Sequence, residues 1–172
     1  NHLPTCDDAH LGALAATAWI EYAGFTNSPA EEVTEIVKNL SQELCLTGEV
    51  FMLRDYHAEN LMWLPSREGI ARAGILDFQD AMRSHPAFDL VSLLQDARRD
   101  LSDGLEDAMI AHYLSESSVN KEEFRAAYAA LGTIRNLRII GVFARLARNG
   151  RTAYLDMLPR VWEHLATDLA HP

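Results

Sequence analysis

Residues 53–64 read LRDYHAENLMWL, so a group of polar side chains separates two apolar runs. Asp55 and Asn60 stand five positions apart in this group, and Asp77 follows the apolar run AGIL further along the chain. A carboxylate can accept or orient the proton of a hydroxyl, and amide and carboxylate oxygens suit Mg²⁺. Phosphoryl transfer uses both kinds of group, because metal ions bridge the phosphates while a carboxylate orients the acceptor hydroxyl. The pattern therefore indicates phosphoryl transfer.

Short strands are expected to position these side chains. Apolar runs at 49–54, 60–64 and 73–78 predict three strands, and the turn-like sequence PSREG separates the last two. We expect 60–64 and 73–78 to form a hairpin. Such a hairpin brings Asn60 and Asp77 to adjacent strand ends, close to the loop 54–60.

Helices are predicted for most of the remaining chain, and several have capping patterns at their starts. We expect helices from Ala9 to about Tyr22 with a cap at Thr5 and an end at Gly24, from Ser28 through Leu44, from Asp103 to about Glu116, from Asn120 to about Gly150, and around Leu158–Leu169, where Pro159 restarts the helix. Two of them carry an apolar face, formed by Val33, Ile36, Val37, Leu40 and Leu44, and by Phe124, Tyr128, Leu131, Ile134, Leu137, Ile140 and Phe143. Trp63 and Trp162 are assigned to the core.

The composition fits one domain, residues 1–172, of the α+β class with mostly α structure. The chain has 172 residues and is 48% hydrophobic. Its net charge of −10, without a basic patch, argues against nucleic-acid binding and favours small or cationic ligands. Cys6 and Cys45 form neither a disulfide framework nor a zinc motif. Neither a membrane span nor a secretory signal is predicted, so we expect a soluble, cytoplasmic protein.

Three segments resemble motifs of the aminoglycoside phosphotransferase and choline kinase superfamily, which has a protein-kinase-like fold. DYHAEN resembles its catalytic loop, ILDFQDA its metal-binding segment, and HPAFDLVSLL the helix that follows. More narrowly, these segments and RNLRIIGVFARLARNG resemble bacterial anomeric kinases that act on N-acetylmuramate and N-acetylglucosamine. The likeness extends from about residue 50 to the end of the chain.

The resemblance implies roles for individual residues. Asp55 matches the catalytic base, and Asn60 and Asp77 match the Mg²⁺ ligands. Asp89 matches the residue that braces the catalytic loop through its backbone amides, and Arg54 is expected to support the same loop. The implied reaction transfers the γ-phosphoryl group of ATP to a hydroxyl of an amino sugar or related acceptor.

Three further residues are candidates for substrate contact. His57 and Gln79 neighbour the predicted catalytic and metal-binding residues. Arg138 belongs to a stripe on the helix that begins at Asn120, with Arg135, Arg145 and Arg148. Such a stripe is usually a solvated face paired with nearby acids, but a substrate-facing Arg138 would suit a sugar that carries a carboxylate.

Two departures from the superfamily leave alternatives open. Leu53 stands where most members have His. No Gly-rich loop or strand lysine for ATP precedes Asp55, and the chain begins without Met, so we expect the C-terminal lobe alone, a piece whose partner is a missing N-terminal lobe. The acceptor could instead be an aminoglycoside, choline or another amino alcohol. The chain could also be a catalytically inactive kinase-like binding module.

Overall fold

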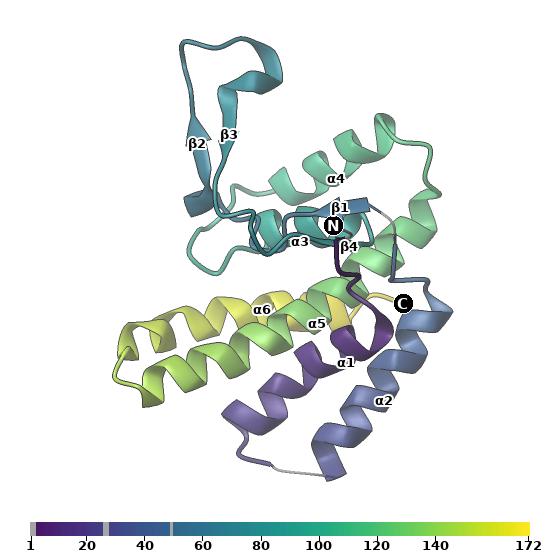
Figure 1. Cartoon of the computed structure of the whole chain (residues 1–172), viewed down its shortest axis with the longest axis vertical. Helices are drawn as coiled ribbons and strands as arrows, with labels where there is room; N and C mark the ends of the chain where they lie inside the picture. Colours follow the sequence, from purple (N-terminus) through teal and green to yellow (C-terminus); the bar gives the residue numbers. More distant parts are fainter. Residues whose placement is uncertain (1–2, 26–27, 49) are drawn as a thin grey trace.

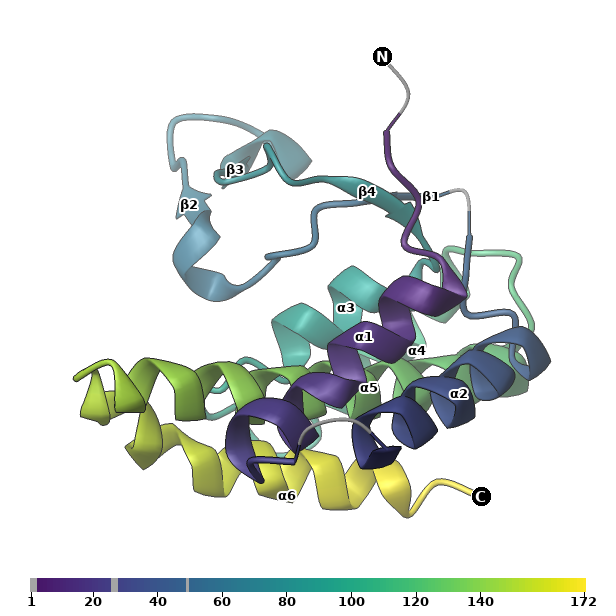
Figure 2. The same cartoon turned by 60° about the horizontal axis from the view of Figure 1, so that its bottom comes forward.

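The computed structural model describes residues 3–25, 28–48 and 50–172. The described residues form six α-helices: α1 (Asp8–Thr17), α2 (Ser28–Glu43), α3 (Ala87–Leu94), α4 (Leu105–Ser115), α5 (Lys121–Arg148) and α6 (Leu158–Leu169). The long helix α5 lies between α6 and α1, and α2 packs on α1 (Figures 1 and 2). This mostly helical structure with small antiparallel sheets is consistent with the predicted α+β class.

Helix α5 begins and packs as the sequence predicts. The side chain of Asn120 accepts hydrogen bonds from the backbone amides of Glu122 and Glu123, at 2.9 and 3.2 Å, which caps the first turn. The apolar stripe from Phe124 to Phe143 is buried, except for a partly buried Leu137. Helix α5 is therefore the central element against which α1, α3 and α6 pack.

The first helix differs from the prediction at its start. Asp7, not Thr5, is the cap, because its carboxylate accepts a hydrogen bond from the His10 backbone amide at 2.8 Å. Thr5 instead forms an isolated parallel β-bridge with Arg83. Helix α1 continues as a π-helical turn, Ala18–Tyr22, and the chain leaves it at Gly24, where φ is +75°. The expected end is confirmed.

Within residues 3–25, 28–48 and 50–172, four short strands form two separate antiparallel pairs. β1 (Val50–Met52) pairs with β4 (Met82–Ser84), and β2 (Leu61–Trp63) pairs with β3 (Ala73–Ile75). The predicted hairpin is confirmed, with Leu61 opposite Ile75. The strand β4 was not predicted, and Glu49 of the expected strand 49–54 lies outside the described residues.

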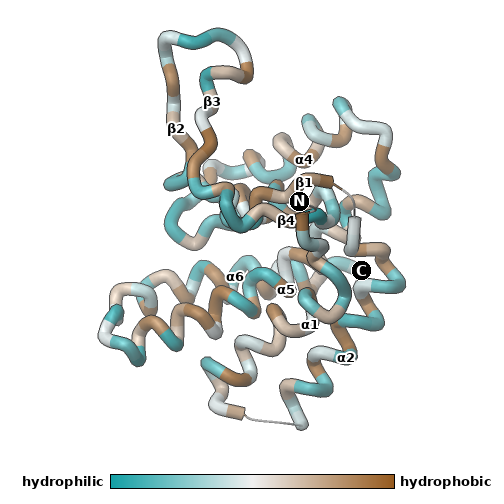
Figure 3. Tube along the Cα trace, in the orientation of Figure 1, coloured by the Kyte–Doolittle hydropathy of each residue, from teal (hydrophilic) through white to brown (hydrophobic). Residues whose placement is uncertain are grey.

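The hairpin β2–β3 extends away from the helices (Figure 1). Assigning Trp63 to the core was therefore wrong: its side chain is 67% exposed and packs against the Arg72 guanidinium, 5.6 Å from the ring centroid. Ile70, near the hairpin tip, is 97% exposed, and hydrophobic stretches are visible along the hairpin in Figure 3. Trp162 and Ile36, also expected to pack inside, are 41% and 57% exposed.

A buried polar network joins α3, α5 and α6. The Asp168 carboxylate accepts from the Gln95 and Asn136 side-chain amides at 2.9 and 3.1 Å. Burial raises the pKa of Asp168 to about 7, although these two hydrogen bonds oppose the rise.

None of the helices in the described part of the chain has the length and apolar character that crossing a membrane requires.

Candidate functional site

The loop that carries Asp55 connects β1 to β2 and is tied to α3. The Asp89 carboxylate, in the first turn of α3, accepts hydrogen bonds from the backbone amides of Leu53 and Arg54, at 2.6 and 3.0 Å. Burial raises the pKa of Asp89, and the two hydrogen bonds partly offset that rise. Leu53 contributes through its backbone, so a Leu side chain at this position does not prevent the contact.

The backbone is strained on both sides of the candidate site. Among the described non-glycine residues, Cys45, Arg54 and Asp77 have positive φ angles, of 51°, 74° and 59°. Such conformations cost on the order of 1–3 kcal/mol each and persist only where surrounding contacts enforce them. Arg54 directly precedes Asp55, the base predicted from the sequence, and Asp77, at the end of β3, is itself a predicted Mg²⁺ ligand.

Asn60 and Asp77 lie at the base of the hairpin. The backbone amide of Leu76 donates to the carbonyl of Asn60 at 2.9 Å, which places Asp77 one residue beyond the pairing partner of Asn60. The Asn60 side-chain amide donates to the backbone carbonyl of Asp55 at 2.9 Å, which leaves its oxygen for another partner. The structure thus brings the amide of Asn60 to the loop of Asp55 and its backbone to the end of β3.

The donor set at the hairpin base suits Mg²⁺. Mg²⁺ binds proteins through one or two carboxylates and completes its shell with water and substrate phosphates. The Asp77 carboxylate and the Asn60 amide oxygen are oxygen donors that could contribute to such a shell, and the Gln79 side chain donates to Asp77 Oδ1 at 2.7 Å. Within the described residues there is no cluster of three His, Cys, Asp or Glu side chains placed to hold a metal ion. An amide with a carboxylate is a different donor set from such a cluster.

Asp55 opens onto a pocket of about 220 Å³ between the loop, α1, α3 and α5. Asp55 and His57 line it from the loop, and Arg138 lines it from α5. An apolar wall is formed by further α5 residues and by Tyr154, whose ring centroid lies 4.9 Å from that of Phe143. The pocket can hold a small molecule with its reacting group at Asp55.

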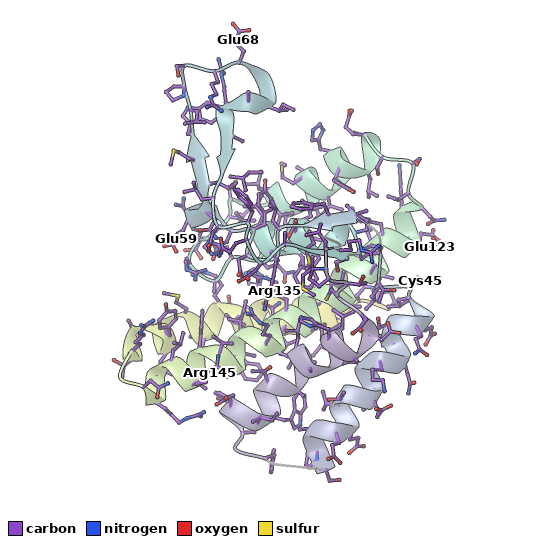
Figure 4. All side chains as sticks on the ribbon, viewed as in Figure 1. Cys45, Glu59, Glu68, Glu123, Arg135 and Arg145 are labelled. Carbon is purple, nitrogen blue, oxygen red and sulfur yellow. The ribbon has the colours of Figure 1, made fainter. Side chains whose placement is uncertain are left out.

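The arginines of α5 have three different environments. Arg145 and Arg148 form ion pairs with Glu21, as expected of a solvated stripe. Arg135 does not fit that expectation: it is only 9% exposed and donates to the backbone carbonyls of Gln95 and Ser92, because α3 and the chain after it cover this part of α5. Figure 4 shows Arg135 near the middle of the molecule and Arg145 further along the helix. Arg138 lies in the pocket with Asp55.

The other two predicted contact residues take different positions. His57 lines the pocket; its Nδ1 is buried with no hydrogen-bond partner in the described structure, and its Nε2 is 3.4 Å from the Asn60 side-chain nitrogen. Gln79 lies outside that pocket and lines a neighbouring depression with Arg54 and His10.

Sequence reasoning missed the pocket residues of the N-terminal segment. Cys6, His10 and Leu14 precede Asp55 by about 40 to 50 residues, and the packing of α1 on α5 brings this segment to the pocket. The sequence pattern gives no sign of this contact.

Comparison with known proteins gives a consistent result. Residues 7–131 match the model of the phosphotransferase enzyme family. The chain is 50% identical over 125 residues to an N-acetylmuramate/N-acetylglucosamine kinase of Caulobacter vibrioides, covering 72% of this chain and 34% of that protein. It is 32% identical over 165 residues to the Pseudomonas aeruginosa protein of the same name, covering 91% of this chain and 46% of the relative.

A third relative of the same name, from Neisseria meningitidis serogroup B, is 30% identical over 139 residues, or 76% of this chain and 40% of the relative. The chain thus spans between a third and a half of the length of these curated relatives. The match to the family model covers well over half of the chain and includes Asp55, Asn60, Asp77 and Asp89. The chain belongs to the phosphotransferase enzyme family.

Proposed function

We propose that the chain is the C-terminal lobe of an ATP-dependent small-molecule kinase, which transfers a phosphoryl group to a hydroxyl of an amino sugar. The observation that carries the proposal is the position of Asp55: it opens onto a small-molecule pocket on a loop braced by Asp89 and bonded to Asn60. The relatives' names support an amino-sugar acceptor, and their greater length fits an ATP-binding lobe outside this chain.

In the proposed reaction, Asp55 receives the proton of the acceptor hydroxyl. The hydroxyl oxygen forms a bond to the γ-phosphorus, and the bond from that phosphorus to the bridging oxygen of ADP breaks. Asn60 and Asp77 are the residues that would hold Mg²⁺, which when bound neutralises charge on the nucleotide phosphates. The rigid backbone contacts of Asp89 keep the Asp55 loop in place for this step.

The charge of the pocket favours an amino sugar over the alternative acceptors. Its lining includes four Arg residues and one Asp, although the whole chain is acidic. Aminoglycosides and choline are cationic, and positive charges in a pocket repel them. A neutral or anionic acceptor fits this lining better.

Two substitutions in the full-length protein test the proposed roles of Asp55 as base and Asp77 as Mg²⁺ ligand separately. Asp55→Asn should lower kcat by ~10²- to 10⁴-fold, the range for a lost general base, with nearly unchanged nucleotide affinity. Asp77→Asn should instead weaken Mg²⁺-dependent nucleotide binding. Unchanged turnover in Asp55→Asn would reject Asp55 as the catalytic base, whereas a full-length wild type that transfers no phosphoryl group would favour an inactive binding module. A panel of N-acetylglucosamine, N-acetylmuramate, an aminoglycoside and choline, with ATP consumption as the readout, identifies the acceptor class.

A further inference from the structure

The pocket beside Asp55 carries more positive charge than its own residues neutralise. Four Arg residues line it, and two of them are satisfied by the protein itself. Arg98 forms ion pairs with Glu59 and Asp96, and Arg135 donates to backbone carbonyls. The other two are Arg54 and Arg138.

Arg138 is a half-buried cation without a bonded partner among the described residues. Its guanidinium makes no hydrogen bond or ion pair with them, including Asp55, which lines the same pocket. Burial lowers the pKa of Arg138; Asp55 opposes this effect, whereas the charges of Arg54 and Arg145 add to it. Holding a guanidinium in a partly desolvated pocket near other cations is unfavourable unless an anion joins it.

Arg138 lies on the acceptor side of Asp55. The pocket is lined by Asp55 and Arg138, but by neither Asn60 nor Asp77, which lie at the hairpin base. The nucleotide phosphates are expected at that base, where the two candidate Mg²⁺ ligands stand. An anion held by Arg138 would therefore belong to the molecule in the pocket.

The same wall of α5 is apolar beyond Arg138. Ile139, Val142 and Leu146 line the pocket at helical spacing, and Tyr154 extends this surface. Such a wall suits the faces and acetyl methyl of an acetylated sugar, while the guanidinium provides two parallel donors for one carboxylate.

We propose that Arg138 binds a carboxylate on the acceptor sugar and thereby favours N-acetylmuramate over N-acetylglucosamine. The two sugars differ by the lactyl ether of N-acetylmuramate, which carries the carboxylate. This inference rests on the proposed function, since it concerns the acceptor of the same reaction.

The experiment compares both acceptors in the full-length protein and its Arg138→Gln and Arg138→Lys variants. We expect Arg138→Gln to lower the ratio of kcat/KM for N-acetylmuramate to that for N-acetylglucosamine by ~10- to 100-fold, mainly through KM for N-acetylmuramate, because a charge-assisted paired hydrogen bond is lost. Arg138→Lys should retain part of the preference, because it keeps the charge without the planar pair of donors. Arg145→Gln is the matched control: it removes a charge from the same helix outside the pocket and should leave the ratio unchanged.

An equal fall in kcat/KM for both sugars would assign Arg138 to the phosphoryl group or to folding and would overturn the proposal. An unchanged ratio in Arg138→Gln would also overturn it. If the wild-type protein phosphorylates neither sugar, the proposed function fails, and binding without nucleotide decides the role of Arg138 separately. Tighter binding of N-acetylmuramate that Arg138→Gln abolishes supports that role. No preference in the wild type, or a preference kept in the variant, overturns it.

Discussion

Replacing Asp89 by Ala should loosen the loop that carries Asp55. Asp89 accepts two backbone hydrogen bonds, from Leu53 and Arg54, and holds Arg54 at a φ of 74°. Hydrogen bonds to a charged acceptor contribute about 1.5–3 kcal/mol each, so two contribute about 3–6 kcal/mol. The cost of burying the carboxylate, which raises the pKa of Asp89, offsets part of this.

We therefore expect the loop in Asp89→Ala to open about 2–3 kcal/mol more easily, which corresponds to a ~30- to 150-fold faster exchange of its amides. The strain at Arg54 acts in the same direction, because the positive φ loses the contact that enforces it. Hydrogen–deuterium exchange of residues 53–60 measures this effect directly. Asp89→Asn keeps one acceptor oxygen and should show an intermediate rate. Exchange at 53–60 equal to that of the wild type in Asp89→Ala would refute the bracing role.

Two further predictions concern stability. Gly141→Ala should destabilise the protein by about 1–3 kcal/mol in chemical denaturation, because a methyl group there would overlap the Thr17 backbone and push α1 from α5; a gain in stability would contradict this packing. The pKa of Asp168 is about 7 in the folded protein but about 4 in the unfolded chain. The folding free energy that protonated Asp168 contributes is therefore fully present below about pH 4 and is lost as the pH rises through about 7. Asp168→Asn should therefore become more stable relative to the wild type as the pH rises over that range, and the control Asp156→Asn, at an exposed position, should show no such trend. A difference in stability between Asp168→Asn and the wild type that does not change with pH would contradict the raised pKa of Asp168.

Local signals predicted the helices well because caps and apolar stripes act over a few residues. Asn120 and the stripe that starts at Phe124 are sufficient to define α5. The strand β4 was missed because MRS has no apolar alternation and depends on β1 for its pairing. Thr5 and Asp7 compete for one cap, and the bridge from Thr5 to Arg83 decides between them.

In the candidate site, too, the local features were predicted from the sequence and the long-range contacts were not. The spacing of Asp55 and Asn60, and the hairpin that leads to Asp77, were readable because they lie within about 25 residues of sequence. The surroundings of the α5 arginines were not readable. A helical wheel places Arg135 and Arg138 near one another, but only the packing of α3 and the loop buries Arg135 and leaves Arg138 in the pocket that Asp55 also lines. Long-range packing therefore determines the pocket, whereas local sequence determines the loop.

Phosphorus NMR of the product that the full-length protein forms from ATP, Mg²⁺ and N-acetylglucosamine or N-acetylmuramate tests directly whether Asp55 supports phosphoryl transfer to an amino sugar. We expect a new sugar-phosphate signal with the wild type and a ~10²- to 10⁴-fold slower appearance of that signal with Asp55→Asn. Equal rates of product formation in the two proteins, or ATP consumption without any sugar phosphate, would contradict it.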